Sequence, residues 1–147
     1  MHFESIFHVD DVFSIGAVAI APTEPDTVWV GTGEGNNSRS SYWGNGIYKS
    51  TDAGESWQHM GLPDSGHIGR IVVHPEDADT VYVAVLGHLY SDNPARGLYR
   101  TTDGGTSWEL VLTDVIEPSG NFENETTRHI GVVEVVMHPT DHDTLYA

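Results

Sequence analysis

The sequence predicts an all-β chain built from a repeated four-stranded unit. Three segments match one another at 15–30, 68–83 and 134–147, each an apolar run followed by a proline-containing turn and an Asp-Thr pair. The segments that follow the first two also match, reading GIYKSTDAGESW at 46–57 and GLYRTTDGGTSW at 97–108. No segment has the sustained 3.6-residue periodicity of an amphipathic helix. Self-similarity on this scale indicates a repeat architecture.

Each unit contains four predicted strands. The first is a short, nearly continuous apolar run, as expected of a strand covered on both faces, and the second is rich in β-branched and aromatic residues. A turn with proline and acidic residues joins these two strands, and a glycine-bearing hairpin joins the third to the fourth. The runs lie at 17–21, 28–30, 47–49 and from Trp57 onward in one unit, and at 71–73, 81–85, 98–100 and from Trp108 onward in the next.

Four antiparallel strands repeated about every 50 residues meet the requirements of a β-propeller blade. We therefore expect a propeller fragment, in which 14–62 and 63–112 are complete blades, 1–13 is the end of a preceding blade, and 113–147 is a connection and the start of a further blade. Because two blades cannot close a ring, the remaining blades of a parent chain are expected partners. A β-sandwich is the competing architecture, but its strands do not normally repeat in sequence.

Two octets mark the predicted hairpins, STDAGESW at 50–57 and TTDGGTSW at 101–108. In such a turn an Asp carboxylate accepts hydrogen bonds from nearby backbone N–H groups, Gly supplies a positive φ, and Trp buries a large ring. The octets resemble the Asp-box of bacterial neuraminidase repeats. We expect a structural role for eight of their residues: Ser50, Asp52, Gly54, Trp57, Thr101, Asp103, Gly105 and Trp108.

The resemblance extends over essentially the whole chain. The stretches VGTGEGNN, WGNGIYKSTDAG, HIGRIVVHP and ARGLYRTTDGGTSW look like sortilin-type propellers and the large bacterial propellers often labelled glycosyl hydrolases, and xyloglucan-cleaving glycoside hydrolases share a similar blade pattern. The sortilin likeness implies a binding or scaffold module for glycan or peptide ligands, which is the favoured expectation. The alternative is part of a glycoside hydrolase, which would need two carboxylates flanking the scissile bond. Either resemblance implies an extracellular or periplasmic parent protein.

Strand direction places the long loops on the face opposite the octets. These loops, at 33–45, 86–96 and 113–129, combine aromatic rings with polar groups that suit sugars or peptides. The loop-face carboxylates near second-strand ends, Glu34 and Asp92, are the catalytic candidates. The ligand-binding candidates, which include two residues at the start of an inner strand, are Glu34, Arg39, Trp43, His67, Arg70, His88, Tyr90 and Arg96.

Composition and motifs exclude several other classes. The net charge of -16, from 22 acidic and 6 basic residues, argues against a nucleic-acid partner. There is no cysteine and no apolar run of about 20 residues, so neither thiol chemistry nor a membrane segment is expected. The GTGEG stretch at 31–35 lacks the last glycine of a dinucleotide fingerprint, and no serine lies in a GxSxG elbow. The pairs His67 with His129 and His74 with His138 are repeat-equivalent, so we expect no metal and no cofactor.

Overall fold

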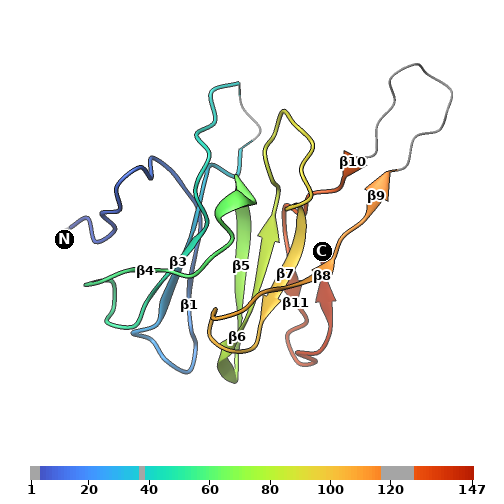
Figure 1. Cartoon of the computed structure of the whole chain (residues 1–147). Helices are drawn as coiled ribbons and strands as arrows, with labels where there is room; N and C mark the ends of the chain where they lie inside the picture. The colour runs from blue at the N-terminus through green and yellow to red at the C-terminus, as the bar shows by residue number, and fades with distance from the viewer. Residues whose placement is uncertain (1–3, 37–38, 117–127) are drawn as a thin grey trace, which may run out of the picture.

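The computed structural model describes residues 4–36, 39–116 and 128–147, and these residues form an all-β structure with one short 3-10 turn (Figure 1). None of the described residues belongs to a helix long and apolar enough to cross a membrane. The strands make two four-stranded antiparallel sheets and two two-stranded sheets. The elements are β1 (Ile15–Ile20), β2 (Val28–Thr32), β3 (Ile47–Ser50), β4 (Gln58–His59), η1 (Pro63–Ser65), β5 (Ile68–His74), β6 (Asp77–Val85), β7 (Gly97–Thr101), β8 (Glu109–Leu112), β9 (Val115–Ile116), β10 (Arg128–His129), β11 (Val136–Met137) and β12 (Leu145–Tyr146).

Each four-stranded sheet is a meander whose strands pair in chain order, β1 to β4 in the first blade and β5 to β8 in the second. The registers correspond: Ile15 pairs with Thr32 in the first blade, and Ile68 pairs with Val85 in the second. The predicted fold class, four-stranded antiparallel blades of a β-propeller, is confirmed. The fourth strands begin one residue later than expected, directly after the octet tryptophans, because pairing with the third strands begins only at Gln58 and Glu109.

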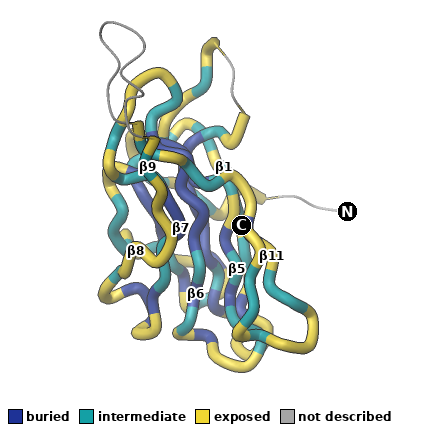
Figure 2. The backbone as a smooth tube through the Cα atoms, turned by 90° about the vertical axis from the view of Figure 1, so that its right-hand side faces the viewer, coloured by how far each residue is buried: buried dark blue, intermediate teal, exposed yellow. Residues whose placement is uncertain are grey.

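A common core joins the two blades. The innermost strand of the second blade, β5, packs against β1 and β2 of the first. Ile71 and Val73 alternate along β5 and, with Ile68 beyond a register shift between Ile68 and Arg70, are buried there beside Trp29 and Ile47 of the first blade. Burial of this continuous apolar surface holds the blades together. Figure 2 shows buried backbone through the middle of the molecule, with exposed residues in the turns and loops at both ends.

The opposite side of the second blade is covered by the C-terminal segment. Val135, just before β11, is fully buried against Ala84 and Leu98, and Leu145 of β12 packs beside this cluster. Strands β11 and β12 form a two-stranded antiparallel sheet. A further pair, β9 with β10, lies on the connection from the second blade. Residues 117–127 of that connection, which the sequence analysis placed among the long loops, lie outside the described residues.

The turns and loops lie on two opposite faces of the blades. Figure 1 shows the described parts of loops 33–45 and 86–96 at one end, beside β9 and β10, and the hairpins at the other. At the hairpin end each octet bonds to the first turn of its own blade, since Ala53 N–H donates to the Asp26 carbonyl (2.9 Å) and Gly104 N–H to the Asp79 carbonyl (3.0 Å). The face with the long loops is called the loop face below.

Candidate ligand-binding face

A row of aromatic side chains crosses the loop face. Phe13 is 75% exposed, Trp43 65% and Tyr90 73%. The rings of Phe13 and Tyr42 lie 6.0 Å apart, and Trp43 meets the imidazole of His88 edge to face at 5.3 Å. These four residues and Tyr90, which lies on the same loop as His88, are called the aromatic row; Phe13 comes from the segment before the first blade and the other four from the two blades. Rings held this way offer flat apolar surfaces to a ligand.

Phe13 was not among the residues predicted from the sequence, although it borders the same shallow cavity as Tyr42 and Trp43, with a volume of about 280 Å³. Its sequence signal is weak, because a single phenylalanine just before an inner strand resembles a core residue. Only the fold shows that the ring lies outside the core, beside Tyr42 of loop 33–45.

The loop that carries Trp43 is anchored by Thr32 at the end of β2. The buried Thr32 hydroxyl donates to the Gly46 carbonyl (2.7 Å) and accepts from the N–H groups of Asn45 (2.9 Å) and Gly46 (3.1 Å). Further along, the Tyr42 carbonyl accepts from the Ser14 hydroxyl at 2.9 Å. The loop base is thereby tied to the sheet by side chains as well as by backbone.

A different residue holds the loop of the second blade. The Arg96 guanidinium donates to the carbonyl oxygens of His88, Ser91 (2.9 Å) and His129 (3.0 Å). Its side chain is 18% exposed. These bonds give Arg96 the role of fastening loop 86–96 to β10, and its ligand-binding role stays a prediction.

Asp92 is engaged with His129. One carboxylate oxygen accepts from the His129 backbone N–H (2.6 Å) and the other lies 2.8 Å from the Nδ1 atom of the same residue. Hydrogen bonding to the His129 ring is the main reason that the pKa of Asp92 is lowered. Since both oxygens already have a partner, this geometry makes Asp92 a support for His129 and leaves its catalytic role a prediction.

Glu34 and His67 lie next to each other at the junction of the blades. His67 is 2% exposed, and its Nδ1 atom has no hydrogen-bond partner among the described residues. Burial lowers the pKa of His67, which favours the neutral imidazole, while a hydrogen bond with the Glu34 backbone acts in the opposite direction. The Glu34 carboxylate is half-buried and makes no hydrogen bond or ion pair to another described residue.

The remaining candidates are more widely spread. Arg70 lies on β5 and pairs with Glu134 at 2.9 Å, facing the C-terminal segment, while Arg39 is exposed in loop 33–45. The structure therefore brings together Trp43 with His88 and Glu34 with His67, and it places Arg70 apart. Within the described ranges, no three His, Asp or Glu side chains are grouped as metal ligands.

The two octets form matching hydrogen-bonded turns on the opposite face. The Asp103 carboxylate accepts from the Ser107 hydroxyl (2.6 Å), the Ser107 N–H (2.9 Å) and the Thr101 hydroxyl (2.7 Å). These bonds lower the pKa of Asp103 from 3.8 to about 2, and the equivalent bonds from Ser56 and Ser50 do the same for Asp52. Carboxylates occupied in this way stabilise the turn.

The octet tryptophans tie each blade to the segment before it. Trp108 Nε1 donates to the Met60 carbonyl at 2.7 Å, and its ring meets Trp29 edge to face at 6.2 Å. Trp57 Nε1 makes the corresponding bond to the Ile6 carbonyl at 2.8 Å. Segment 4–8 therefore contacts the first blade as the end of the first blade contacts the second.

Comparison with known proteins adds the functional context. The chain is similar in sequence to xyloglucanases. A xyloglucanase of a Paenibacillus species is 31% identical over 107 residues, which cover 67% of this chain and 10% of that protein. Xyloglucanase Xgh74A of Acetivibrio thermocellus is 27% identical over 147 residues, covering 89% of this chain and 16% of the relative. A probable oligoxyloglucan-reducing end-specific xyloglucanase of Neosartorya fischeri is 29% identical over 99 residues, or 64% of this chain and 10% of that protein. No protein-family model matches the chain.

Solved structures with some likeness include two GH74 enzymes. An ancestral GH74 enzyme matches 65% of this chain and 12% of its own, with a TM-score of 0.46 and 21% identity. YCF48 from Cyanidioschyzon merolae matches 74% of this chain and 26% of its own, with a TM-score of 0.44 and 17% identity. The GH74 enzyme of Niastella koreensis matches 67% and 22%, with a TM-score of 0.39 and 16% identity. The chain spans only 10% to 16% of the length of the sequence relatives above.

Proposed function

We propose that the chain forms part of the substrate-binding face of a glycoside hydrolase that acts on a xyloglucan-like polysaccharide. The observation that carries the proposal is the aromatic row on the loop face, whose exposed rings can stack against the apolar faces of successive sugar residues. Similarity to three xyloglucanases supports this class of substrate. The row draws on both blades, as a polymer lying across the propeller would require.

The sortilin-type binding module expected from the sequence has less support. The sequence relatives are named xyloglucanases, which favours the alternative interpretation of the same blade pattern. The acidic chain also offers few cations for pairing with an acidic peptide, since Arg96 is bound to backbone carbonyls and Arg70 to Glu134. Aromatic stacking is the interaction that the loop face provides best.

Glu34 is the better of the two catalytic candidates. A proton-transferring carboxylate needs a free oxygen directed to substrate, and the described residues leave the Glu34 carboxylate without a partner. Asp92, by contrast, uses both oxygens to hold His129. We therefore assign proton transfer to Glu34 and a positioning role to Asp92 within this proposal.

The proposal also covers the structural role of the octets and the boundaries of the blades. We propose that 50–57 and 101–108 are Asp-box turns, supported by the matching hydrogen bonds around Asp52 and Asp103. The division into blades at 14–62 and 63–112, flanked by 1–13 and 113–147, is proposed on the same repeat. In this arrangement the octets support the propeller, and the opposite face binds substrate.

The test uses binding and turnover measured separately on the full-length protein. Trp43→Ala is expected to weaken xyloglucan binding about tenfold, the equivalent of about 1.4 kcal/mol for one lost stacking contact. Glu34→Gln is expected to lower kcat by about 100-fold or more while binding is retained. Glu55→Gln, on the exposed part of an octet, is the matched control and should change neither quantity.

Three results would contradict the proposal. Unchanged binding in Trp43→Ala would remove the loop face from substrate recognition. Full activity in Glu34→Gln would exclude that carboxylate from proton transfer. Tight glycan binding by the wild-type protein with no hydrolysis would favour a binding module over an enzyme.

A further inference from the structure

The first blade holds a phenyl ring between the tyrosine of its third strand and the tryptophan of its octet. Phe7 meets Tyr48 at 5.4 Å and Trp57 at 5.1 Å, both nearly perpendicular. Trp57 also donates its indole N–H to the carbonyl of Ile6, the residue directly before Phe7. The space between these two aromatic residues is therefore filled by the chain itself.

The second blade has the same aromatic pair without the ring between them. Tyr99 and Trp108 occupy the positions of Tyr48 and Trp57. Trp108 donates to the carbonyl of Met60, and the residue directly after Met60 is Gly61, which stands where the first blade has Phe7. A Cβ on Gly61 would lie 3.4 Å from the Trp108 ring, so a side chain there would enter this space.

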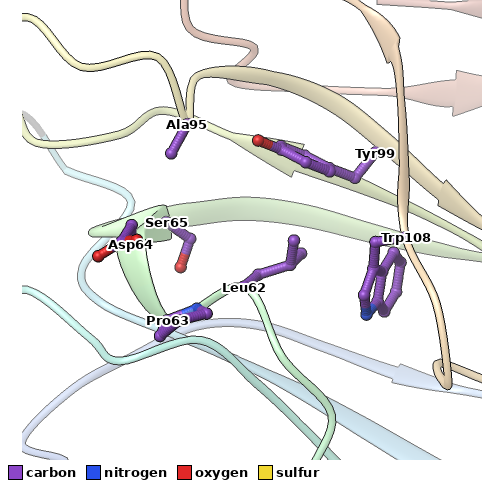
Figure 3. A pocket seen from close by; sticks show the side chains of 7 residues that line it. All are labelled: Leu62, Pro63, Asp64, Ser65, Ala95, Tyr99 and Trp108. Carbon is purple, nitrogen blue, oxygen red and sulfur yellow. The ribbon is translucent and has the colours of Figure 1, made fainter.

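A cavity of about 320 Å³ occupies this position. Figure 3 shows Tyr99 on one side of it and Leu62 and Pro63 on the other, with Trp108 at one end and Ser65 toward the opposite end. Ligand pockets range over about 300–1,000 Å³, so this one suits a single ring rather than a chain of sugars. Its lining comes from the second blade and from Leu62 at the end of the first, and it does not include any residue of the aromatic row.

The two hydroxyl groups of the cavity have no hydrogen-bond partner in the part of the chain that the structure describes. Ser65 is 2% exposed, and its hydroxyl makes no hydrogen bond to a described residue. The Tyr99 hydroxyl makes none either, whereas the equivalent Tyr48 hydroxyl donates to Asn45 at 3.0 Å. Asp64 adds an exposed carboxylate at the rim. A buried hydroxyl without a partner is costly, and a ligand with its own hydroxyl groups would relieve that cost.

We propose that this cavity binds a single pyranose ring. The apolar face of the sugar would lie against Trp108 and Leu62, where the first blade packs a phenyl ring, and its hydroxyl groups would bond to Ser65, Tyr99 and Asp64. The site goes beyond the proposed function, since occupation of this cavity requires neither catalysis nor the aromatic row. A free monosaccharide and a side-branch residue of a polysaccharide share the chemistry that the cavity recognises.

The test labels the tryptophans of the protein with 5-fluorotryptophan and follows the 19F resonances, assigned with single Trp→Phe variants. The probes are methyl β-D-glucopyranoside, methyl α-D-xylopyranoside, a branched xyloglucan oligosaccharide and phenol. Saturable shifts of the Trp108 resonance by a glycoside are expected, with Trp57 unaffected because Phe7 fills its cavity. Binding of the methyl glycosides identifies a free sugar as sufficient, and binding of the oligosaccharide alone identifies a branch residue; either supports the proposal.

Two variants separate ligand binding from structural effects. Ser65→Ala and Tyr99→Phe are each expected to weaken binding about three- to tenfold, the effect of one hydrogen bond. Ser65→Ala should leave Tm unchanged or raise it, because it removes a buried hydroxyl that has no partner. Tyr48→Phe is the matched control in the first blade and should leave binding unchanged.

Several outcomes would overturn the proposal. One is the absence of a saturable Trp108 shift at about 0.1 M glycoside, a concentration about a hundredfold above a weak Kd of about 1 mM. Another is binding of phenol without binding of any sugar. Undiminished sugar binding in both Ser65→Ala and Tyr99→Phe would overturn it as well. Because these readouts do not involve Trp43 or Glu34, their failure is distinguishable from failure of the proposed hydrolase function.

Discussion

Replacing Thr32 with valine tests how the loop face is held. The two side chains have nearly the same shape, so the change removes a hydroxyl without opening a cavity. It also reproduces the second blade, where the residue at the equivalent register position is Val85. If Thr32 anchors loop 33–45, the valine variant should be less stable and its loop looser.

The size of the effect follows from the three hydrogen bonds of the Thr32 hydroxyl. The Gly46 carbonyl loses one donor but still accepts from the Thr32 backbone N–H at 3.1 Å, so this loss costs about 1 kcal/mol. The buried Gly46 N–H loses the hydroxyl as acceptor, at a cost of about 1–3 kcal/mol. The half-exposed Asn45 N–H can donate a hydrogen bond to water instead, so its loss adds little to the free-energy cost. With a small gain from burying the valine methyl group, the expected destabilisation is about 2–3 kcal/mol.

Equilibrium urea unfolding and calorimetry measure this loss, which corresponds to a fall in Tm of about 5–10 °C for a chain of this size. Acrylamide quenching of Trp43 should rise, because that residue is on the released loop. Thr27→Val is the matched control: Thr27 is buried too, but its hydroxyl donates one bond, to the Glu24 carboxylate at 3.2 Å. Destabilisation of Thr32→Val below about 0.5 kcal/mol, or no larger than that of Thr27→Val, would refute the anchoring role.

Three further outcomes are expected. Gly16→Ala should destabilise the chain by more than about 3 kcal/mol in urea unfolding, because the new Cβ would collide with backbone carbonyl oxygens of the neighbouring strand and loop. Gly35→Ala is the control and should be nearly neutral, because the atom nearest to its Cβ is 4.0 Å away. Equal stability of the two variants would contradict the close approach at Gly16. The pKa values of Asp52 and Asp103 are about 2 in the folded chain against an ordinary 3.8, so their stabilising contribution is complete above pH 3.8 and is lost as the pH falls toward 2. Urea midpoints should fall in that window, less so in a double Asp→Asn variant, and an identical acid profile in that variant would count against the assignment. Val18→Lys, on an exposed apolar face of β1, should reduce concentration-dependent self-association of the isolated chain in sedimentation velocity, and unchanged association would place the contact elsewhere.

The strands and the octets could be predicted because their causes are local and repeated. The run at 81–85 is apolar and β-branched in the sequence itself, and the Asp103 carboxylate of octet 101–108 accepts its hydrogen bonds from residues within the octet. The same strand directions also predict that the long loops share one face. These features need no contact between distant parts of the sequence.

The roles of loop residues could not be predicted in this way, because they depend on distant partners. The sequence predicts Arg96 as a ligand-binding cation, but it gives no sign of the hydrogen bond from Arg96 to the His129 carbonyl, 33 positions along the chain. The contacts of both Asp92 carboxylate oxygens with His129 are likewise hidden from the sequence, which offers Asp92 only as a loop-face carboxylate. Residue type alone gives a charge or an aromatic ring, and only the neighbouring element decides whether that group is free for a ligand.

Differences between the repeats are therefore more informative than the repeats themselves. Because the backbone registers of the two blades match, a change of side chain at an equivalent position changes the local chemistry while the strand pairing is kept. The second strand ends with Thr32 in the first blade and with Val85 in the second. The following loop is therefore held by the Thr32 hydroxyl in the first blade and by the Arg96 guanidinium in the second. Glycine in place of phenylalanine leaves the cavity beside Trp108 open, although the tryptophan keeps its bond to the preceding carbonyl. A blade can thus lose one packing side chain, retain its fold through the remaining contacts, and present the vacated space to a ligand.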